Sequence, residues 1–271
     1  MVVFPNAKIN LGLHITAKRA DGYHDIETLY YPISLRDALE IIPAPDGRFQ
    51  FSSTGLEIPG HPGSNLCIRA FEILSGDFDL PPVHIYLHKV IPIGAGLGGG
   101  SSDGAFAVGL LNNLFTLGLS AETMKEYTLN LGSDCPFFIE NKPLFGSGRG
   151  DRFEPAPVDL SGYFIMVVVP GVHVPTAEAY AGVTPHKSAV SLRVVLDQAM
   201  STWKENLVND FESSVIQKHP IIGEIKNRLY RSGALYASMS GSGSAVYGLF
   251  KEIPELKERF PGCFTFVTRD A

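Results

Sequence analysis

Several residue types that mark particular protein classes are scarce in this sequence. Its 271 residues include only three cysteines, Cys67, Cys135 and Cys263, and these form no CxxC pair. Neither a disulfide framework nor a structural zinc site is therefore suggested, and an odd, scattered set of cysteines fits a reducing compartment. Basic residues form no block and the formal net charge is −6, which argues against nucleic acid as a partner.

Signals for export and for membrane insertion are also missing. No basic segment followed by an apolar run opens the chain, because Pro5, Asn6 and Lys8 interrupt it, and we predict no signal peptide. The apolar stretch from Phe164 to Val169 is far too short to span a bilayer. We expect a cytoplasmic protein without a membrane partner, and the sequence leaves the oligomeric state open.

The composition is that of a globular protein, with 45% hydrophobic and 18% charged residues, and the length suits one large domain or two small ones. Strand-like and helix-like stretches follow one another without regular βαβ alternation, which favours an α+β fold over a doubly wound one. The segment from Gly146 to Pro157 is rich in Gly, Pro and charge and predicts a domain boundary. We place the domains at residues 1–150 and 151–271.

Individual elements follow from apolar periodicity and turn residues. The expected strands are several in residues 1–60, then VHIYLHKVI, YFIMVVVP, the two in ALYASMSGSGSAVYGLF, and CFTFVT. The expected helices are Asn65 to Leu74, about Ser101 to Phe115, one from its N-cap Ser120 to Leu131, several between Thr176 and Tyr230, and a short one before the last strand.

A run of glycines follows the strand VHIYLHKVI and precedes an apolar helix. Residues 92–102 read PIGAGLGGGSS, and five of the seven positions from Gly94 to Gly100 are glycine. One interpretation is a flexible linker, although linkers do not usually lie between an apolar strand and an apolar helix. Another is a dinucleotide fingerprint, since Gly94, Gly96 and Gly99 satisfy GxGxxG. That fingerprint also needs a second strand ending in an acidic residue about 20 positions later, and here a helical pattern continues instead.

The third interpretation is a cradle for the phosphates of a nucleoside triphosphate. Glycines let the backbone approach phosphate oxygens, and the free N–H groups and dipole at the start of the next helix favour anions. Ser101 and Ser102 add hydroxyl donors or a metal ligand. No GK[ST] is present, so this is not a Walker A loop.

Four other segments hold polar residues whose meaning is open when each is taken alone. In PNAKINLGL, Lys8 and Asn10 point to one face of a strand, where a lysine is either exposed at an edge or buried beside a partner. In GSDCPFF, Asp134 lies in a short loop and is either a helix cap or a functional aspartate. MSGSGS, residues 239–244, is a glycine loop or an ordinary hairpin turn. DGYH, residues 21–24, is a plain turn or one that presents two rings.

Together, PNAKINLGL, PIGAGLGGGSS and MSGSGS resemble the three motifs of the GHMP kinases, a family that includes galactokinase, homoserine kinase and mevalonate kinase. The stretches KINLGLHITAKRADGYHDIETLY, GLGGGSSDGA and LGSDCPFF narrow the resemblance to the branch that phosphorylates a cytidyl-linked methylerythritol in the non-mevalonate isoprenoid pathway. The resemblance runs along nearly the whole chain. It implies a two-lobed fold with the active site in the cleft between the lobes, and an N-terminal ATP-binding domain.

The resemblance also implies a role for each matching residue. Lys8 and Asp134 match the catalytic lysine and aspartate, which the resemblance places face to face, and Ser102 is a candidate ligand of the Mg²⁺ that accompanies ATP. The residues implied at the cytidyl substrate are Asn10, Tyr23, His24 and Thr176. The residues implied at ATP are Asn65 and Lys89 on the adenine side and, in the phosphate loop, Pro92, Ile93, Gly94, Ala95, Gly96, Leu97, Gly98, Gly99, Gly100, Ser101 and Ser102.

One residue departs from the family pattern. Many relatives have Asn where this chain has Asp103, whose carboxylate would be repelled by bound phosphates. It therefore points away, caps the helix or approaches the ribose, and we assign it no role.

The competing functions are another GHMP kinase, acting on homoserine or mevalonate, a non-catalytic protein of the same fold, and an NAD-binding oxidoreductase. DGYH favours the cytidyl substrate, because a nucleobase suits a ring face and an imidazole edge.

Overall fold

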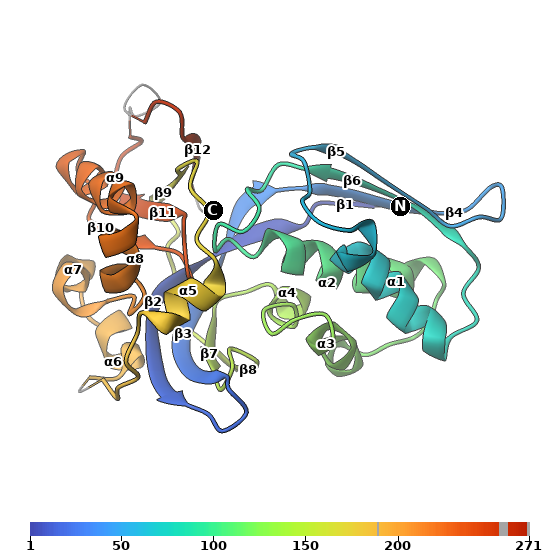
Figure 1. Ribbon diagram of the computed structural model, residues 1–271, viewed down its shortest axis with the longest axis horizontal. Coiled ribbons are helices and arrows are strands. Elements are labelled where there is room, and N and C mark those ends of the chain that lie inside the picture. The colour runs from blue at the N-terminus through green and yellow to red at the C-terminus, as the bar shows by residue number, and fades with distance from the viewer. Residues whose placement is uncertain (189, 255–259, 270–271) are drawn as a thin grey trace. The chain divides into compact units, whose positions relative to one another are not determined.

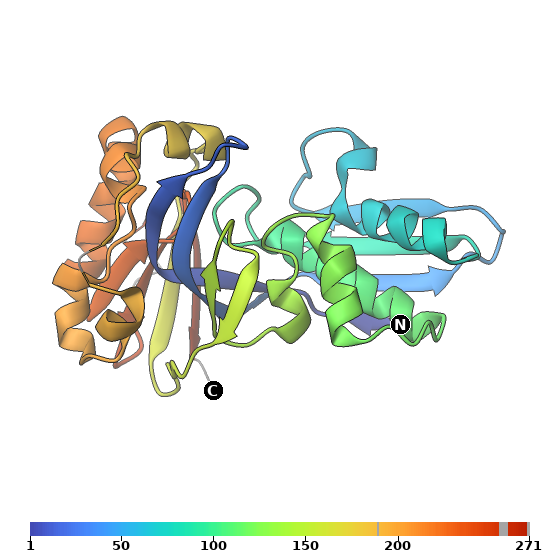
Figure 2. The same ribbon diagram turned by 90° about the horizontal axis from the view of Figure 1, so that it is seen from below.

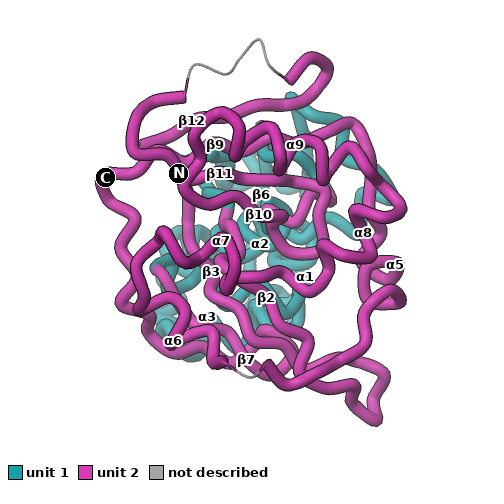
Figure 3. Tube along the Cα trace, turned by 90° about the vertical axis from the view of Figure 1, so that its left-hand side faces the viewer, with its two compact units in different colours: residues 1–7, 35–93, 98–142 teal, residues 8–34, 94–97, 143–271 magenta. Residues whose placement is uncertain are grey.

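The structure is a computed structural model that describes residues 1–188, 190–254 and 260–269. The chain forms two compact units (Figure 3). The first consists of residues 1–7, 35–93 and 98–142, and the second of residues 8–34, 94–97 and 143–271. A contiguous division at residue 150, as predicted from the sequence, does not coincide with these units. Residues 8–34 belong to strands that share a sheet with strands after residue 143.

The first unit is a four-stranded sheet packed against helices. The strand order is β1-β4-β6-β5, in which β5 runs parallel to β6 and the other pairs are antiparallel. Leu39 and Ile85 of the sheet share a core with Leu74 of α1 and Leu111 of α2, and Figure 2 shows both helices beside the sheet. The elements are β1 (Val2–Val3), β4 (Ala38–Pro43), β5 (Gln50–Gly55), the 3-10 helix η1 (Pro62–Ser64), α1 (Leu66–Asp77), β6 (Val83–Lys89), α2 (Gly99–Leu114), α3 (Ala121–Leu129) and α4 (Phe137–Glu140).

The second unit contains two four-stranded sheets. One has the order β2-β3-β7-β8 and the other, antiparallel throughout, has the order β10-β11-β9-β12. The strands are β2 (Asn6–Lys18) and β3 (His24–Arg36), each of which has two residues counted with the first unit, β7 (Leu144–Ser147), β8 (Arg152–Pro155), β9 (Phe164–Val169), β10 (Tyr236–Met239), β11 (Val246–Phe250) and β12 (Phe264–Arg269).

Helices of the second unit cover the sheet that contains β11. Figure 1 shows α8 and α9, in orange, against this sheet. Ile222, Ile225 and Leu229 of α9 share a core with Met166 and Val246 of the strands. The helices are α5 (Thr176–Ala181), α6 (Leu192–Leu196), the 3-10 helix η2 (Met200–Thr202), α7 (Trp203–Asn206), α8 (Glu212–Lys218) and α9 (Pro220–Arg231).

Most predicted elements are confirmed, and a polar residue explains where each of two helices, α1 and α3, begins. The Ser120 hydroxyl accepts the Thr123 N–H and caps α3, as predicted. Asn65 caps α1 in the same way by accepting the Cys67 N–H. The short helix predicted before the last strand falls largely on residues 255–259, which lie outside the described residues.

Candidate active site

The glycine run is a loop fixed by hydrogen bonds to two other segments, so the interpretation as a flexible linker is wrong. The backbone has positive φ at Gly94, Gly96 and Gly98, with values of 66°, 78° and 70°, a conformation that favours glycine because other residues carry a Cβ. On one side the Lys8 N–H donates to the Leu97 carbonyl at 2.9 Å, and on the other the Ala245 N–H donates to the Ala95 carbonyl at 3.0 Å. The loop thus lies hydrogen-bonded between two other motifs.

Gly96 is the point at which the three motifs meet in the second unit. Its carbonyl accepts the Lys8 ammonium at 3.0 Å and the Ser240 hydroxyl at 2.8 Å. A Cβ at Gly96 would lie 2.0 Å from the Ser240 carbonyl oxygen, so no other residue fits without a shift of the backbone. Three segments that are far apart in the sequence are therefore joined around one carbonyl group.

Lys8 is buried, which settles the choice left open by the sequence. Its side chain is 3% exposed, and its Nζ donates to Asn10 Oδ1 at 2.6 Å. The Asn10 amide donates in turn to Thr28 Oγ1 at 3.0 Å, and the Tyr30 ring centroid lies 5.4 Å from Lys8 Nζ. A buried ammonium needs such partners, because burial without them is very costly. The network fixes the position of the lysine on β2.

Two polar residues that the sequence did not single out, Asn209 and Glu212, form hydrogen bonds with the backbone of the MSGSGS segment. Asn209 Nδ2 donates to the carbonyls of Met239 and Gly241, at 2.9 and 2.8 Å. Glu212 Oε1 accepts the Met239 N–H at 2.7 Å, and its other oxygen accepts Lys226 at 2.6 Å. The sequence signal was available in NDFE, residues 209–212, where three polar residues accompany a single phenylalanine.

Helix α2 begins in the glycine run and presents its free N–H groups there. Its N-cap, Gly98, makes no side-chain hydrogen bond, so the first turn keeps backbone donors that suit an anion. Ser102 is fully buried, and within the described part of the chain its hydroxyl has no hydrogen-bond partner. An oxygen with unused lone pairs fits a hard cation such as Mg²⁺, so the donor chemistry agrees with the predicted ligand.

Lys89 lies in a buried cluster with two carboxylates. Its Nζ contacts Asp37 and lies 2.7 Å from Asp103 Oδ2, and all three residues are at most 3% exposed. Burial raises the pKa of Asp103 to about 7, with Lys89 opposing this and Asp37 adding to it. Asp103 therefore points into the first unit, one of the outcomes expected for it. The adenine-side role of Lys89, like that of Asn65, stays a prediction.

The rings of the DGYH segment belong to the second unit. The His24 ring stacks on Tyr180 of α5, with centroids 4.8 Å apart and planes at 21°. Tyr23 is 56% exposed, and the Arg149 guanidinium lies 5.2 Å from its ring centroid. The sequence reasoning did not single out Tyr180 and Arg149; Tyr180 ends the stretch PGVHVPTAEAY, one helical turn after Thr176. An exposed ring beside a stacked imidazole offers flat surfaces that suit a nucleobase.

Thr176 and the MSGSGS segment meet through their hydroxyl groups. Thr176 begins α5, and its Oγ1 lies 3.3 Å from the Ser242 hydroxyl. His173, three residues earlier, would be 3.0 Å from a Cβ placed on Gly94. The residues before α5 are therefore neighbours of the glycine loop and of the third motif.

Asp134 lies in the first unit, in the turn before α4. The Cys135 N–H donates to the Gly132 carbonyl at 3.1 Å, which closes the turn, and Asp134 is half-buried. Burial raises the pKa of the neighbouring Cys135 thiol to about 12. Its predicted pairing with Lys8, which belongs to the second unit, stays a prediction.

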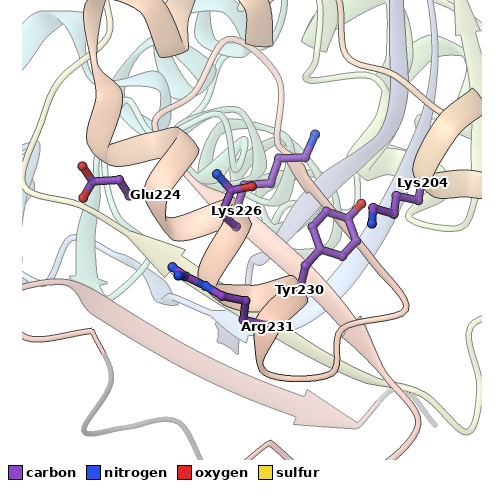
Figure 4. A pocket seen from close by; sticks show the side chains of 6 residues that line it. Lys204, Glu224, Lys226, Tyr230 and Arg231 are labelled. Atoms are coloured by element: carbon purple, nitrogen blue, oxygen red, sulfur yellow. The ribbon is translucent and has the colours of Figure 1, made fainter.

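A separate hollow lies beside α9 (Figure 4). It has a volume of about 620 Å³. Two of its cations already have partners, since Lys226 contacts Glu212 at 2.6 Å and Lys204 lies 5.0 Å from the Tyr230 ring centroid. None of the three motifs contributes to it. Its lining residues are Lys204, Glu224, Lys226, Asn227, Tyr230 and Arg231.

Comparison with known proteins gives two family matches and many relatives. Residues 65–142 match the GHMP kinases N terminal domain and residues 193–262 match the GHMP kinases C terminal domain. The 4-diphosphocytidyl-2-C-methyl-D-erythritol kinase of Bacteroides thetaiotaomicron is 52% identical over 260 residues, which is 95% of each chain. The enzyme of the same name from Cytophaga hutchinsonii is 53% identical over 256 residues, 94% of each chain.

Solved structures give the same result at the level of the fold. A crystal structure of 4-(cytidine 5'-diphospho)-2C-methyl-D-erythritol kinase is 29% identical, with a TM-score of 0.82 and full coverage of both chains. The mevalonate kinase of Methanococcus jannaschii is 15% identical, with a TM-score of 0.73 over 98% of this chain and 97% of that one, a likeness of fold alone. Among the described residues, no helix is both long and apolar enough to cross a membrane.

Proposed function

Since the chain belongs to the GHMP kinase family, we propose that it transfers the γ-phosphoryl group of ATP to a hydroxyl of 4-diphosphocytidyl-2-C-methyl-D-erythritol. The relatives that are about half identical along nearly the whole chain carry this activity in their names. The structural observation that supports it is the meeting of three motifs at Gly96, which fixes Lys8, the glycine loop and MSGSGS together. Three free cysteines fit a cytoplasmic enzyme.

The proposed donor site is the glycine loop and the first turn of α2. Backbone N–H groups at Gly99, Gly100 and Ser101 would bind phosphate oxygens, because they have no partner within the helix. Ser102 would hold Mg²⁺ together with water and the phosphates, and the ion would neutralise charge on the phosphate oxygens. Phosphoryl transfer depends mostly on such positioning and charge neutralisation.

On the acceptor side we assign one role to Asp134 in the first unit and others to Lys8 and the rings in the second unit. Asp134 orients the attacking hydroxyl and accepts its proton, and Lys8 stabilises the developing negative charge. Tyr23, and the stack of His24 on Tyr180, bind the cytosine through their faces and the imidazole edge. Thr176 and Asn10 bind polar groups of the same substrate.

The first experiment compares acceptor substrates in a phosphoryl-transfer assay with ATP. We expect turnover with the cytidyl substrate and at least a hundredfold lower kcat/KM with mevalonate and homoserine. Comparable turnover of mevalonate or homoserine would replace this proposal by another kinase of the same family. No turnover of any of the three acceptors would contradict it altogether.

The second experiment tests the glycine loop without disturbing the fold. A Cβ at Gly99 would lie 2.8 Å from Ile91 and 2.9 Å from Lys89 Nζ, whereas Gly100 and Gly109 of the same helix have nothing within 4 Å. Gly100→Val should weaken ATP binding at least tenfold in a folded protein, because the new side chain stands where the phosphates approach. Gly109→Val is the matched control and should bind ATP normally. Equal ATP affinity of the two variants would exclude the loop as the phosphate site.

A further inference from the structure

Three side chains outside the proposed kinase machinery gather in the second unit. They are His14 of β2, His186 between α5 and α6, and Asp210 before α8, and their ligand atoms all lie within 4.8 Å of one another. His14 Nδ1 is 3.6 Å from Asp210 Oδ1, and His186 Nδ1 is 3.9 Å from Asp210 Oδ2. These distances are long for hydrogen bonds. They are close to the separation of about 3.4 Å between neighbouring ligands of a tetrahedral zinc ion with bonds of about 2.1 Å.

The His14 ring is buried without hydrogen bonds. The residue is 2% exposed, and neither ring nitrogen has a hydrogen-bond partner within the ranges that the structure describes. Buried polar groups normally have partners, because their loss of water is costly otherwise. Lys8 and Asn10 of the same strand are also buried, and both of their side chains are hydrogen-bonded. A cation between His14 and Asp210 would give the imidazole the partner that it lacks.

The backbone holds all three residues to one short stretch of β2. The Asp210 N–H donates to the Leu13 carbonyl at 2.9 Å, and Asp210 Oδ2 accepts the Ile15 N–H at 2.7 Å. The His186 N–H donates to the Ile15 carbonyl at 2.9 Å. These bonds do not involve a metal, so the three ligand atoms are already close before an ion binds. Such pre-organisation lowers the cost of binding.

We propose that His14, His186 and Asp210 bind one zinc-type divalent transition-metal ion, with a fourth position open to water. Two imidazoles and one carboxylate suit zinc and its neighbours, whereas Mg²⁺ and Ca²⁺ take oxygen ligands. The ion would link His186 and Asp210 to His14 of β2, and Asp210 is the residue that follows Asn209. Because Asn209 donates a hydrogen bond to the MSGSGS segment, the ion would stabilise the part of the second unit that holds this segment.

The test uses the full chain after treatment with a chelator, with Zn²⁺ and Co²⁺ as probes. His186→Gln is the decisive variant, since this side chain is 56% exposed and its replacement should leave the fold intact. His219→Gln is the matched control, because the His219 ring also faces a carboxylate, that of Glu178 at 3.2 Å, with no third ligand in the described part of the chain. We expect one equivalent of Zn²⁺ by calorimetry and a rise in Tm with Zn²⁺, because an ion that binds only the folded state stabilises it.

In His186→Gln we expect the Zn²⁺ affinity to fall at least tenfold and the rise in Tm to disappear, while His219→Gln behaves like the parent. Bound Co²⁺ should show visible absorption bands without the ultraviolet band of a thiolate ligand. The absence of saturable binding at one equivalent, an affinity unchanged by His186→Gln, or a thiolate band would each overturn the proposal.

Discussion

The ammonium of Lys89 lies 2.7 Å from Asp103 Oδ2 inside the first unit, and the same nitrogen also contacts Asp37. Two carboxylates thus share one buried cation, so one negative charge is not balanced within the cluster. Asp103 is the weaker member, because its Oδ1 has no hydrogen-bond partner among the described residues, whereas Asp37 Oδ1 accepts the N–H groups of Val90 and Ile91. The imbalance explains why burial raises the pKa of Asp103 to about 7.

This cluster predicts a pH dependence of stability. The pKa of Asp103 is about 7 in the folded chain and 3.8 in the unfolded one, so folding takes up a proton between these values. The stabilising contribution is complete below about pH 4 and is lost as the pH rises through 7. The free energy of unfolding of the parent, relative to Asp103→Asn, should therefore fall between pH 4.5 and 7.5 in urea denaturation.

An exposed aspartate provides the control for this measurement. The N–H of Ser161 lowers the pKa of Asp159, so Asp159→Asn should keep a constant difference from the parent across the same pH range. A difference for Asp103→Asn that stayed constant, or that grew with pH, would mean that Asp103 is ionised throughout.

A second prediction concerns the support of the third motif. Asn209→Ala removes the donor of two buried hydrogen bonds and leaves the carbonyls of Met239 and Gly241 without this partner. An unsatisfied buried polar group costs about 1–3 kcal/mol, so the free energy of unfolding should fall by about 2–5 kcal/mol. Asn206→Ala, which removes one exposed bond to Thr202, should cost under 1 kcal/mol. Equal losses of unfolding free energy in the two variants would show that the buried hydrogen bonds of Asn209 contribute no more than the exposed bond of Asn206.

The catalytic roles of Lys8 and Asp134 are tested by a double variant. Asp134→Asn should lower kcat by on the order of 10²–10⁴ if the carboxylate handles the proton, and Lys8→Ala should lower it too. In the predicted pairing the double variant loses much less than the product of the two effects, because groups that act as a unit are not additive. Losses that multiply strictly in steady-state kinetics would show that the two residues act independently.

The nucleobase site is tested at its exposed ring. Stacking of a base on an aromatic ring is worth about 1–3 kcal/mol, so Tyr23→Ala should raise the KM of the cytidyl substrate roughly tenfold, about 1.4 kcal/mol. The KM of ATP should hardly change. Tyr86→Ala, at another exposed tyrosine that is 37% exposed, is the control and should leave both KM values alone. A raised KM for ATP with an unaltered KM for the cytidyl substrate would assign Tyr23 to the adenine instead.

The sequence by itself determined the elements and the family. Glycines at fixed spacing, a capping asparagine or serine before α1 and α3 and a sparse set of cysteines are local features, and each has a local physical meaning. They predicted the α+β fold, the N-cap Ser120 and the GHMP kinase family. Those predictions are confirmed by the elements, the family matches and the relatives.

Only the tertiary structure decided how the buried charges are satisfied. The sequence left Lys8 as either exposed or buried, left Asp103 without a role and said nothing of Asn209 or of the cluster of His14, His186 and Asp210. The partners of these residues are as distant as 195 residues along the chain, as in the bond from Ile15 to Asp210. The local sequence around a polar side chain does not show which distant group it will contact. Burial of that side chain is energetically tolerable only when the folded chain supplies a partner.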